Sequence, residues 1–419
     1  MSEQTPAPLM VIGAGIAGLT AALEAAEAGR EVVLVERQPS IGGRVLNNHN
    51  YFPKLCPPSC GMEINTRRLE NNPRITVFTS TTVSKAERVG DLWEVALTTA
   101  PAYVNSRCTA CDECSRVCPV KVPDPFNLGQ VEVPAIHLPH LDAWPQRYVL
   151  ERAACPTDCT ACVDTCQYLA IDLGASEQVT NLTAGAVVLA TGWQPYPLEN
   201  LSDLGGGELP NVINNVTMER LVSPTGPTGG KILCPGSNAA PQRVAFVQCA
   251  GSRDVNHLPY CSAVCCLAAM KQAMYVKEQL PDCEVSIYYI DRRTPGRNED
   301  MLTRVEALEG VELIKGKVGR IEQGDAQDVV LRVENVETGE LLKVKADLAV
   351  LATGMVPALS EGTLPFAVRT DDDGFGLEDD DANLFVAGVA KRPEDVAASV
   401  RDATGTAAKA CVGALRSAP

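Results

Sequence analysis

The chain has a deficit of basic residues and no long hydrophobic segment. It contains 36 Lys and Arg against 52 Asp and Glu, a formal net charge of −16 at pH 7. Nucleic-acid binding depends on basic side chains that neutralise phosphates, so this balance argues against a nucleic-acid partner. No segment reaches the roughly 18 consecutive apolar residues of a transmembrane helix. Any contact with a membrane would therefore have to come through partner proteins.

A signal peptide and a histidine-based metal motif are also missing. The first apolar run, residues 9–12, opens a glycine turn and follows no basic segment. The four histidines, His49, His137, His140 and His257, show no metal-ligand spacing with one another. We therefore expect a cytoplasmic, reduced protein. In that compartment the 17 cysteines of the chain are better explained as metal ligands than as disulfides.

A glycine-rich turn lies near the N-terminus, between two apolar runs. Residues 8–38 read as a strand, a turn, an alanine-rich helix and a second strand. Gly13, Gly15 and Gly18 form the G-x-G-x-x-G pattern, which lets the backbone approach a pyrophosphate at a helix N-terminus. Glu36 closes the second strand, where a carboxylate would bind ribose hydroxyls. This segment predicts a dinucleotide-binding site.

The dinucleotide is predicted to be FAD. The motif at residues 41–44, Ile-Gly-Gly-Arg, follows at once, and residues 185–192 and 347–354 each end an apolar run with Thr-Gly. Simple strand ends would also explain the Thr-Gly pairs. Residues 383–410 read as a strand, a glycine turn and a helix starting near Pro393. The candidate FAD-binding residues are Gly13, Gly15, Gly18, Glu36, Arg37, Gly43, Arg44, Thr191, Gly192, Thr353, Gly354 and Gly388.

Over most of the chain this pattern resembles the thioredoxin reductase type of flavoprotein, an α/β fold with two dinucleotide-binding domains. The resemblance implies that the last helix points its N-terminus at the flavin pyrimidine, where a partial positive charge stabilises reduced flavin. That family usually has Asp after the glycine of the last turn. Here the residue after Gly388 is Val389, so we do not expect the usual ribityl contact.

Two cysteine runs interrupt the flavoprotein pattern. The first has the C-x2-C-x2-C-x3-C-P spacing of bacterial ferredoxins, and the second has a first gap of three residues and Gln167 in place of the proline. In two-cluster ferredoxins the fourth cysteine of each run ligates the other [4Fe–4S] cluster. One cluster would then use Cys108, Cys111, Cys114 and Cys166, and the other Cys155, Cys159, Cys162 and Cys118. Zinc would more often use separated cysteine pairs.

A third set of cysteines occupies the place of a second phosphate loop. Residues 243–248 read as a strand and residues 263–279 as a helix, but only Gly251 remains of a glycine-rich turn. Binding of a pyridine nucleotide is therefore disfavoured. Cys249, Cys261, Cys265 and Cys266 could instead reach one [4Fe–4S] cluster, although unliganded core cysteines would also explain them. Cys56 and Cys60 form a further pair whose role stays open.

The third set carries a second resemblance. The segments FVQC, GSRD, YCS and CC, followed by a lysine-bearing helix, are similar to the A subunits of heterodisulfide reductases. In that family the matching four cysteines hold a non-standard cluster beside the flavin. The short length and the segment YFPKLCPPSCGMEIN, residues 51–65, also resemble the A subunits of the quinone-interacting membrane-bound oxidoreductases (Qmo) of sulfate-reducing bacteria.

This second resemblance implies one component of a cytoplasmic complex held at the inner membrane by its partners. The implied partners are a second heterodisulfide reductase A-like flavoprotein and a haem-containing membrane subunit. Electrons would pass between the quinone pool and adenylylsulfate reductase, with flavin-based confurcation or bifurcation as an option. The alternatives are a heterodisulfide reductase A-like subunit of another soluble complex, a self-sufficient NAD(P)H-dependent reductase and a zinc-stapled assembly protein.

With 419 residues, of which 45% are hydrophobic and 21% charged, the chain can form two or three domains. We predict residues 1–99 as the first part of the FAD-binding domain, 100–178 as an inserted ferredoxin-like two-cluster module and 179–200 as a continuation of the FAD-binding domain. Residues 201–242 would be a linker, 243–346 a second Rossmann-like domain, and 347–419 the C-terminal part of the FAD-binding domain.

Overall fold

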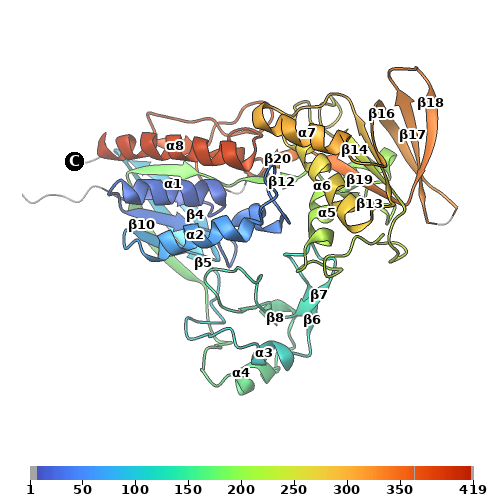
Figure 1. Ribbon diagram of the computed structural model, residues 1–419. Coiled ribbons are helices and arrows are strands. Elements are labelled where there is room, and N and C mark those ends of the chain that lie inside the picture. Colours follow the sequence, from blue (N-terminus) through green and yellow to red (C-terminus); the bar gives the residue numbers. More distant parts are fainter. Residues whose placement is uncertain (1–6, 326, 363, 417–419) are drawn as a thin grey trace, which may run out of the picture.

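Two sheets, each covered by helices, form two lobes, and a module at residues 100–177 extends from the first (Figure 1). The computed structural model describes residues 7–325, 327–362 and 364–416. We call the lobe that contains the first glycine turn the flavin lobe, and the lobe built around residues 212–353 the second lobe. In the described part of the chain, no helix is both long and apolar enough to cross a membrane.

The flavin lobe is built on a parallel sheet of five strands. Their order is β21 (Leu384–Val386), β11 (Ala186–Leu189), β1 (Leu9–Ile12), β2 (Val32–Val35) and β3 (Ile75–Phe78). Four of these strands are apolar and buried along their whole length, as expected for a parallel sheet covered on both faces. Helices α1 (Ile16–Glu27) and α8 (Val396–Arg416) cover one face side by side (Figure 1).

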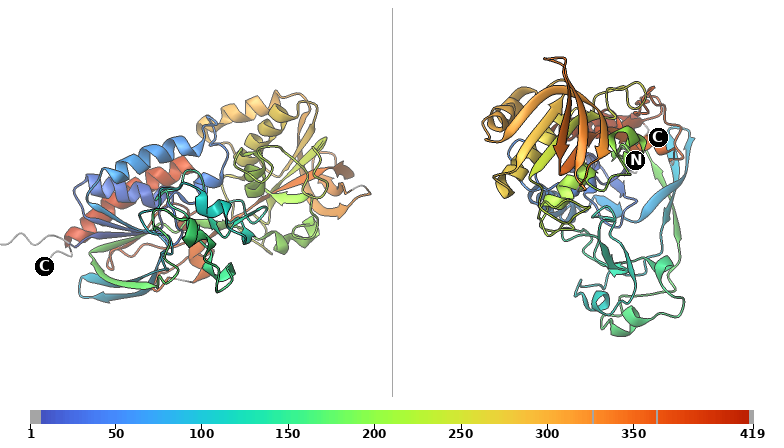
Figure 2. Two further views of the ribbon diagram at one scale, coloured as in Figure 1. Left: turned by 90° about the horizontal axis from the view of Figure 1, so that it is seen from below. Right: turned by 90° about the vertical axis from the view of Figure 1, so that its right-hand side faces the viewer.

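The other face of that sheet packs against an antiparallel sheet of β4 (Thr81–Val89), β5 (Leu92–Thr99) and β10 (Gln178–Ala184). Strands β5 and β10 are neighbours, with Thr99 directly opposite Gln178. Residues 100–177, which we call the inserted module, therefore leave and re-enter the sheet at facing positions. The right-hand view of Figure 2 shows this module projecting from the lobes.

The inserted module contains only short elements. They are α3 (Glu113–Arg116), β6 (Lys121–Pro123), β7 (Glu132–Pro134), β8 (Ile136–His137), β9 (Val149–Leu150) and α4 (Ala161–Thr165). Its core is correspondingly small, because just six buried residues form it and two of these are cysteines. They are Val104, Cys114, Ile136, Tyr148, Cys162 and Ile171. The module therefore has little apolar packing of its own.

The second lobe has a larger sheet. The order is β13 (Val212–Asn214), β19 (Leu348–Thr353), β14 (Arg243–Ala250), β15 (Glu284–Tyr289), β16 (Val311–Gln323), β17 (Val329–Asn335) and β18 (Leu341–Ala346). The first five strands run parallel and the last two pair antiparallel. Helices α5 (Asn215–Val222), α6 (Cys265–Gln279) and α7 (Glu299–Glu306) contribute to an extensive core on one face.

The domain boundaries differ from the predicted ones at two strands. Strand β19 was expected in the flavin domain and β13 in a linker, but both pair within the sheet of the second lobe. The physical reason is that β11 and β19 are almost interchangeable as sequences. Both are short apolar runs followed by Thr-Gly, and the pattern of a buried parallel strand does not specify which sheet receives it.

Two short strands connect the lobes. Strand β12 (Trp193–Pro195) follows β11 of the flavin lobe and leads to the second lobe, whereas β20 (Met355–Pro357) follows β19 and leads back. The two strands pair antiparallel, and Figure 1 shows them between the lobes. The remaining helix of the flavin lobe, α2 (Pro58–Glu70), follows a loop at residues 48–57.

Candidate cofactor sites

The first glycine turn follows β1 and leaves no room for side chains. Gly13 has φ +98°, and a Cβ there would lie 2.4 Å from the carbonyl oxygen of Ala190. A Cβ on Gly18 would lie 1.7 Å from the carbonyl oxygen of Gly13, and one on Gly43 would lie 2.8 Å from the Cα of Gly15. The two predicted glycine motifs thus meet at the N-terminus of α1, in a cradle that admits only backbone.

Glu36 stands directly after β2 and is buried beside that cradle. Its Oε2 accepts a hydrogen bond of 2.7 Å from the backbone N–H of Ala14, and its Oε1 accepts one of 2.8 Å from that of Gln38. Burial raises the pKa of Glu36, and these N–H groups oppose the shift. The neighbouring Arg37 points elsewhere, because it forms an ion pair with Glu361 at 3.2 Å.

Two buried polar groups near the start of β12 lack a partner among the described residues. Arg44 lies over the ring of Trp193 at 4.8 Å and donates from Nη1 to Oε1 of Gln194 at 2.9 Å, but its buried Nη2 has no partner. Burial lowers the pKa of Arg44 to about 10. The hydroxyl of Thr191 is likewise buried without a partner. Unpartnered donors beside a glycine cradle fit a bound dinucleotide.

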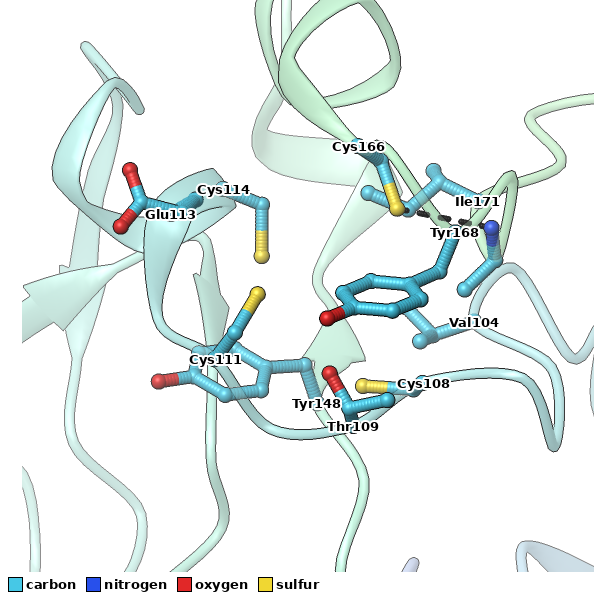
Figure 3. A pocket seen from close by; sticks show the side chains of 11 residues that line it. Val104, Cys108, Thr109, Cys111, Glu113, Cys114, Tyr148, Cys166, Tyr168 and Ile171 are labelled. Atoms are coloured by element: carbon cyan, nitrogen blue, oxygen red, sulfur yellow. Dashed lines mark hydrogen bonds between the residues drawn. The ribbon is translucent and has the colours of Figure 1, made fainter.

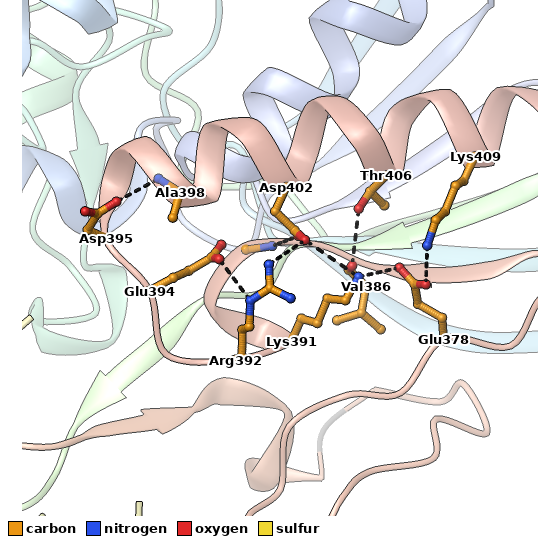
Figure 4. Close-up of polar contacts among 11 residues, drawn as sticks. Glu378, Val386, Lys391, Arg392, Glu394, Asp395, Ala398, Asp402, Thr406 and Lys409 are labelled. Atoms are coloured by element: carbon orange, nitrogen blue, oxygen red, sulfur yellow. Dashed lines mark hydrogen bonds and ion pairs between the residues drawn. The ribbon is translucent and has the colours of Figure 1, made fainter. Parts of the chain in front are cut away.

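The last helix is anchored to the glycine turn before it. The backbone N–H of Gly388 donates to Oδ2 of Asp402 at 2.9 Å, and Asp402 also pairs with Lys391 and Arg392 at 3.6 and 3.2 Å (Figure 4). Helix α8 begins at Val396, three residues later than Pro393, and Oδ1 of Asp395 accepts from the backbone N–H of Ala398 at 2.7 Å. Asp395 therefore caps this helix.

Cysteines from both runs of the inserted module meet in one pocket. Cys166 of the second run lies with three cysteines of the first run, and Val104, Tyr148 and Ile171 supply apolar walls (Figure 3). Burial, followed by the charge of Cys108, raises the pKa of Cys114 to about 12. The four cysteines that line the pocket are Cys108, Cys111, Cys114 and Cys166.

The other four cysteines of the module form a second group. Burial and then the nearby Cys118 and Cys159 raise the pKa of the Cys162 thiol. Burial and the nearby Cys118 also raise the pKa of Cys155, whereas a hydrogen bond from Arg152 opposes the shift. Cys118 therefore lies with the cysteines of the second run, just as Cys166 lies with those of the first.

The third group lies at the carboxyl end of the second sheet. Cys249 stands at a bulge at the end of β14 with φ +55°, and Cys265 and Cys266 are the first two residues of α6. Cys265 is buried, and burial followed by the charges of Cys249, Cys266 and Cys261 raises the pKa of its thiol. The thiol of Cys266 donates to the carbonyl oxygen of Asp291 at 3.5 Å.

Thr353 and Gly354, which were predicted to bind FAD, lie beside the third cysteine group. They follow β19 in the second lobe, where the thiol of Cys265 donates to the carbonyl oxygen of Thr353 at 3.6 Å. A Cβ on Gly354 would lie 2.6 Å from the hydroxyl of Ser252. The pair lies at this place because β19 is a strand of the second lobe's sheet.

Within the residues that the structure describes, no set of three or more His, Cys, Asp or Glu side chains could hold a single metal ion. A multi-iron cluster holds its ligand sulfurs further apart than a single ion does. Cys56 and Cys60 are both exposed, Cys56 just before α2 and Cys60 in its first turn.

A buried polar network that the sequence patterns did not reveal joins the module to the lobes. Arg220 of α5 is 1% exposed, lies over the ring of Phe126 at 4.5 Å and donates to Oδ1 of Asn127 at 2.9 Å. Beside it, Lys271 and Glu219 form an ion pair of 3.0 Å with both side chains 4% exposed. Nothing in the spacing of these residues announces the network, since its members come from three distant segments.

Comparisons with known proteins agree with a dinucleotide-binding site in the flavin lobe. A family model described as an NAD(P)-binding Rossmann-like domain matches residues 11–80, which include both glycine motifs and Glu36. Among curated proteins, the A subunit of a ferredoxin/F(420)H(2)-dependent CoB-CoM heterodisulfide reductase from Methanosarcina acetivorans is 33% identical over 416 residues. The match covers 96% of this chain and 52% of that protein.

Similar relatives occur in other archaea. The A subunit of an H(2):CoB-CoM heterodisulfide,ferredoxin reductase from Methanothermobacter marburgensis is 31% identical, with 96% of this chain and 63% of that protein covered. A protein from Archaeoglobus profundus, described as like the A subunits of heterodisulfide reductases, is 32% identical, with 96% and 65% covered. The homologues are heterodisulfide reductase A subunits. This chain spans about half to two thirds of the length of these curated relatives.

Solved structures confirm the predicted α/β fold of the thioredoxin reductase type. Thioredoxin reductase from Lactococcus lactis aligns with a TM-score of 0.52 at 15% identity, over 98% of this chain and 99% of that one. A bacillithiol disulfide reductase from Bacillus cereus aligns with a TM-score of 0.54 at 15% identity and the same coverage. At this identity the likeness concerns the fold alone. The heterodisulfide reductase A relatives, in contrast, match by sequence across the cysteine-bearing segments as well.

Proposed function

We propose that this chain is an oxidoreductase subunit that transfers electrons between one FAD and three [4Fe–4S] clusters. The observation that carries the proposal is the pocket that Cys166 shares with Cys108, Cys111 and Cys114. Exchange of the fourth cysteine between two runs is the ligation scheme of two-cluster ferredoxins. A chain with two such groups would carry single electrons through the inserted module.

The flavin lobe would hold FAD in the backbone cradle at the N-terminus of α1. Glu36 would accept hydrogen bonds from ribose hydroxyls, and Arg44 and Thr191 would use their unpartnered donors on the cofactor. When bound, the flavin exchanges electron pairs with one partner and single electrons with iron–sulfur centres. The capped N-terminus of α8 would favour negative charge on the cofactor.

The second lobe would hold the third cluster in place of a pyridine nucleotide. Strand β14 is the first strand of the unit formed by β14, α6 and β15. It ends in a bulge at Cys249 rather than in a glycine-rich phosphate turn. Cys265 and Cys266 occupy the start of α6, where backbone N–H groups would otherwise face a pyrophosphate. This arrangement favours an electron-transfer subunit over a self-sufficient NAD(P)H-dependent reductase.

We further propose that the protein works inside a membrane-associated complex of the quinone-interacting type, between the quinone pool and adenylylsulfate reductase. The segment at residues 51–65, which resembles the Qmo A subunits, supports this role. The expected partners are a second heterodisulfide reductase A-like flavoprotein and a haem-containing membrane subunit. The relatives favour a second candidate, a heterodisulfide reductase A-like subunit of another electron-transfer complex.

Anaerobic purification with cofactor analysis tests the cofactor assignment. We expect one FAD and about twelve irons with about twelve labile sulfides per chain, four of each for every cluster. Fewer than about eight irons after anaerobic reconstitution would remove at least one of the proposed clusters. Bleaching of the flavin by NADH in the isolated chain would favour the self-sufficient reductase instead.

Anaerobic co-purification from the native host tests the complex. Recovery together with a haem protein of the membrane would support the quinone-linked role. Recovery with only soluble proteins would favour the second candidate. Recovery as a lone, NADH-active chain would contradict both.

A further inference from the structure

Tyr260 stands one residue before Cys261, in the loop at residues 249–262 that carries part of the third cysteine group. Its hydroxyl donates to the carbonyl oxygen of Met355 at 2.7 Å, and its own carbonyl accepts from the N–H of Arg253 at 3.0 Å. Met355 is the first residue of β20, which leads back to the flavin lobe. Tyr260 thus ties the cysteine-bearing loop to a connecting strand.

The ring of Tyr260 also contacts the flavin lobe itself. It meets the ring of Phe375 edge-on, with centroids 5.1 Å apart and an interplanar angle of 72°. Phe375 is buried in the segment between β20 and β21. The next residue, Gly376, donates its N–H to the carbonyl oxygen of Ala390 at 2.9 Å, in the turn that leads to α8. Through Phe375, Tyr260 therefore links the loop that carries Cys261 to the turn that precedes α8.

Tyr196, directly after β12, contacts the same loop from the other connecting strand. A hydrogen bond of 2.9 Å joins its hydroxyl to Nδ1 of His257. Its ring lies so close to Gly251 that a Cβ there would be 2.8 Å from the ring. In addition, the hydroxyl of Ser262 accepts from the N–H of Met355 at 3.0 Å. The loop is thus held against both strands that connect the lobes.

We propose that Tyr260 is a positioning residue that fixes the cysteine-bearing loop of the second lobe against the flavin lobe, with Tyr196 as a second anchor. The inference deepens the proposed function and rests on it. Two lobes joined by two short strands can rotate about them, and such rotation would change the separation of the two redox sites. Short, constant separation is what single-electron transfer requires, so the loop is held by contacts independent of the cluster.

Hydrogen–deuterium exchange at residues 353–359 tests the proposal on the anaerobically purified chain. Tyr260→Phe removes the hydrogen bond to Met355 but keeps the ring, whereas Tyr260→Ala removes both contacts. We expect about fivefold faster exchange in this peptide for Tyr260→Phe, the factor for one lost hydrogen bond, and a larger increase for Tyr260→Ala. Tyr289→Phe is the matched control, because it removes a hydroxyl from β15 and keeps the ring that Arg292 covers.

Three outcomes decide the matter. Faster exchange confined to the connecting strands, with unchanged exchange in β14 and in residues 348–352, and electron transfer from reduced flavin to the clusters that is slower in Tyr260→Ala than in Tyr260→Phe, support a positioning role. Unchanged exchange at residues 353–359 in Tyr260→Ala, or equally faster exchange throughout the second lobe, overturns it. Iron content is measured on the same samples. If the wild-type chain contained no iron, only the proposed function would be contradicted, because the exchange comparison does not depend on iron.

Discussion

The inserted module and the second lobe use cysteines on very different foundations. In the module, two of the six buried core residues are themselves candidate ligands, and its helices are four and five residues long. In the second lobe, three of the four candidate ligands stand at the end of the largely buried strand β14 of a seven-stranded sheet and at the start of a 15-residue helix. The comparison teaches that similar ligand sets can either build a fold or be added to one.

Removal of iron should separate the two regions most strongly. We expect anaerobic chelation to unfold residues 100–177, because metal binding supplies folding free energy where a core is small. The sheet of the second lobe should stay protected. Hydrogen exchange of the iron-free chain measures both regions at once. An iron-free module as protected as the second lobe would break the comparison.

Two matched cysteine variants sharpen the comparison between the inserted module and the second lobe. Cys166→Ser and Cys265→Ser should each lower the iron content by about four of about twelve atoms, one cluster each. Only Cys166→Ser should also make the module sensitive to proteolysis. Cys56→Ser, on an exposed thiol outside the three groups, serves as the control and should keep all of the iron. Equal proteolysis of the module in both ligand variants would contradict the distinction.

The stability of the second lobe should depend on the buried ion pair between Lys271 and Glu219. Glu219→Gln leaves the ammonium group of Lys271 buried without its carboxylate, which costs about 3–5 kcal/mol of stability. Glu63→Gln removes one partner of an exposed ion pair on α2 and should change stability by less than about 1 kcal/mol. Thermal unfolding measures both changes in stability, and hydrogen exchange in α6 for Glu219→Gln and in α2 for Glu63→Gln locates them. Equal effects would mean that burial at Glu219 carries no special weight.

The junction between the module and the second lobe should give a smaller effect than the buried ion pair. Arg220→Lys removes the planar group that covers Phe126 and the hydrogen bond to Asn127. Lysine has no planar guanidinium group with several N–H donors. We therefore expect stability to fall by about 1–3 kcal/mol, seen as faster hydrogen exchange at residues 124–128. Unchanged exchange there would show that the module docks without Arg220.

The sequence supports prediction wherever local spacing carries the chemistry. The glycines at 13, 15 and 18 predicted the cradle at α1. The ferredoxin spacing predicted that Cys166 would lie with the cysteines of the first run and Cys118 with those of the second. Cluster binding by these groups remains a prediction. Local spacing failed where assignment depended on a distant sheet, as for β19, which pairs in the second lobe. Contacts such as Tyr260 with Phe375 could not be predicted at all, because they join segments more than a hundred residues apart.

The facing pair Thr99 and Gln178 has a consequence for how such a protein can change. A tight turn could replace residues 100–177 without altering the spacing of β5 and β10, although excision would uncover the part of the flavin-lobe core on which Phe126 and Trp144 pack. The candidate cluster ligands of the module are therefore carried by one continuous insertion. If the proposed clusters bind there, recombination at a single hairpin would add, remove or exchange them while β5 and β10 keep their pairing.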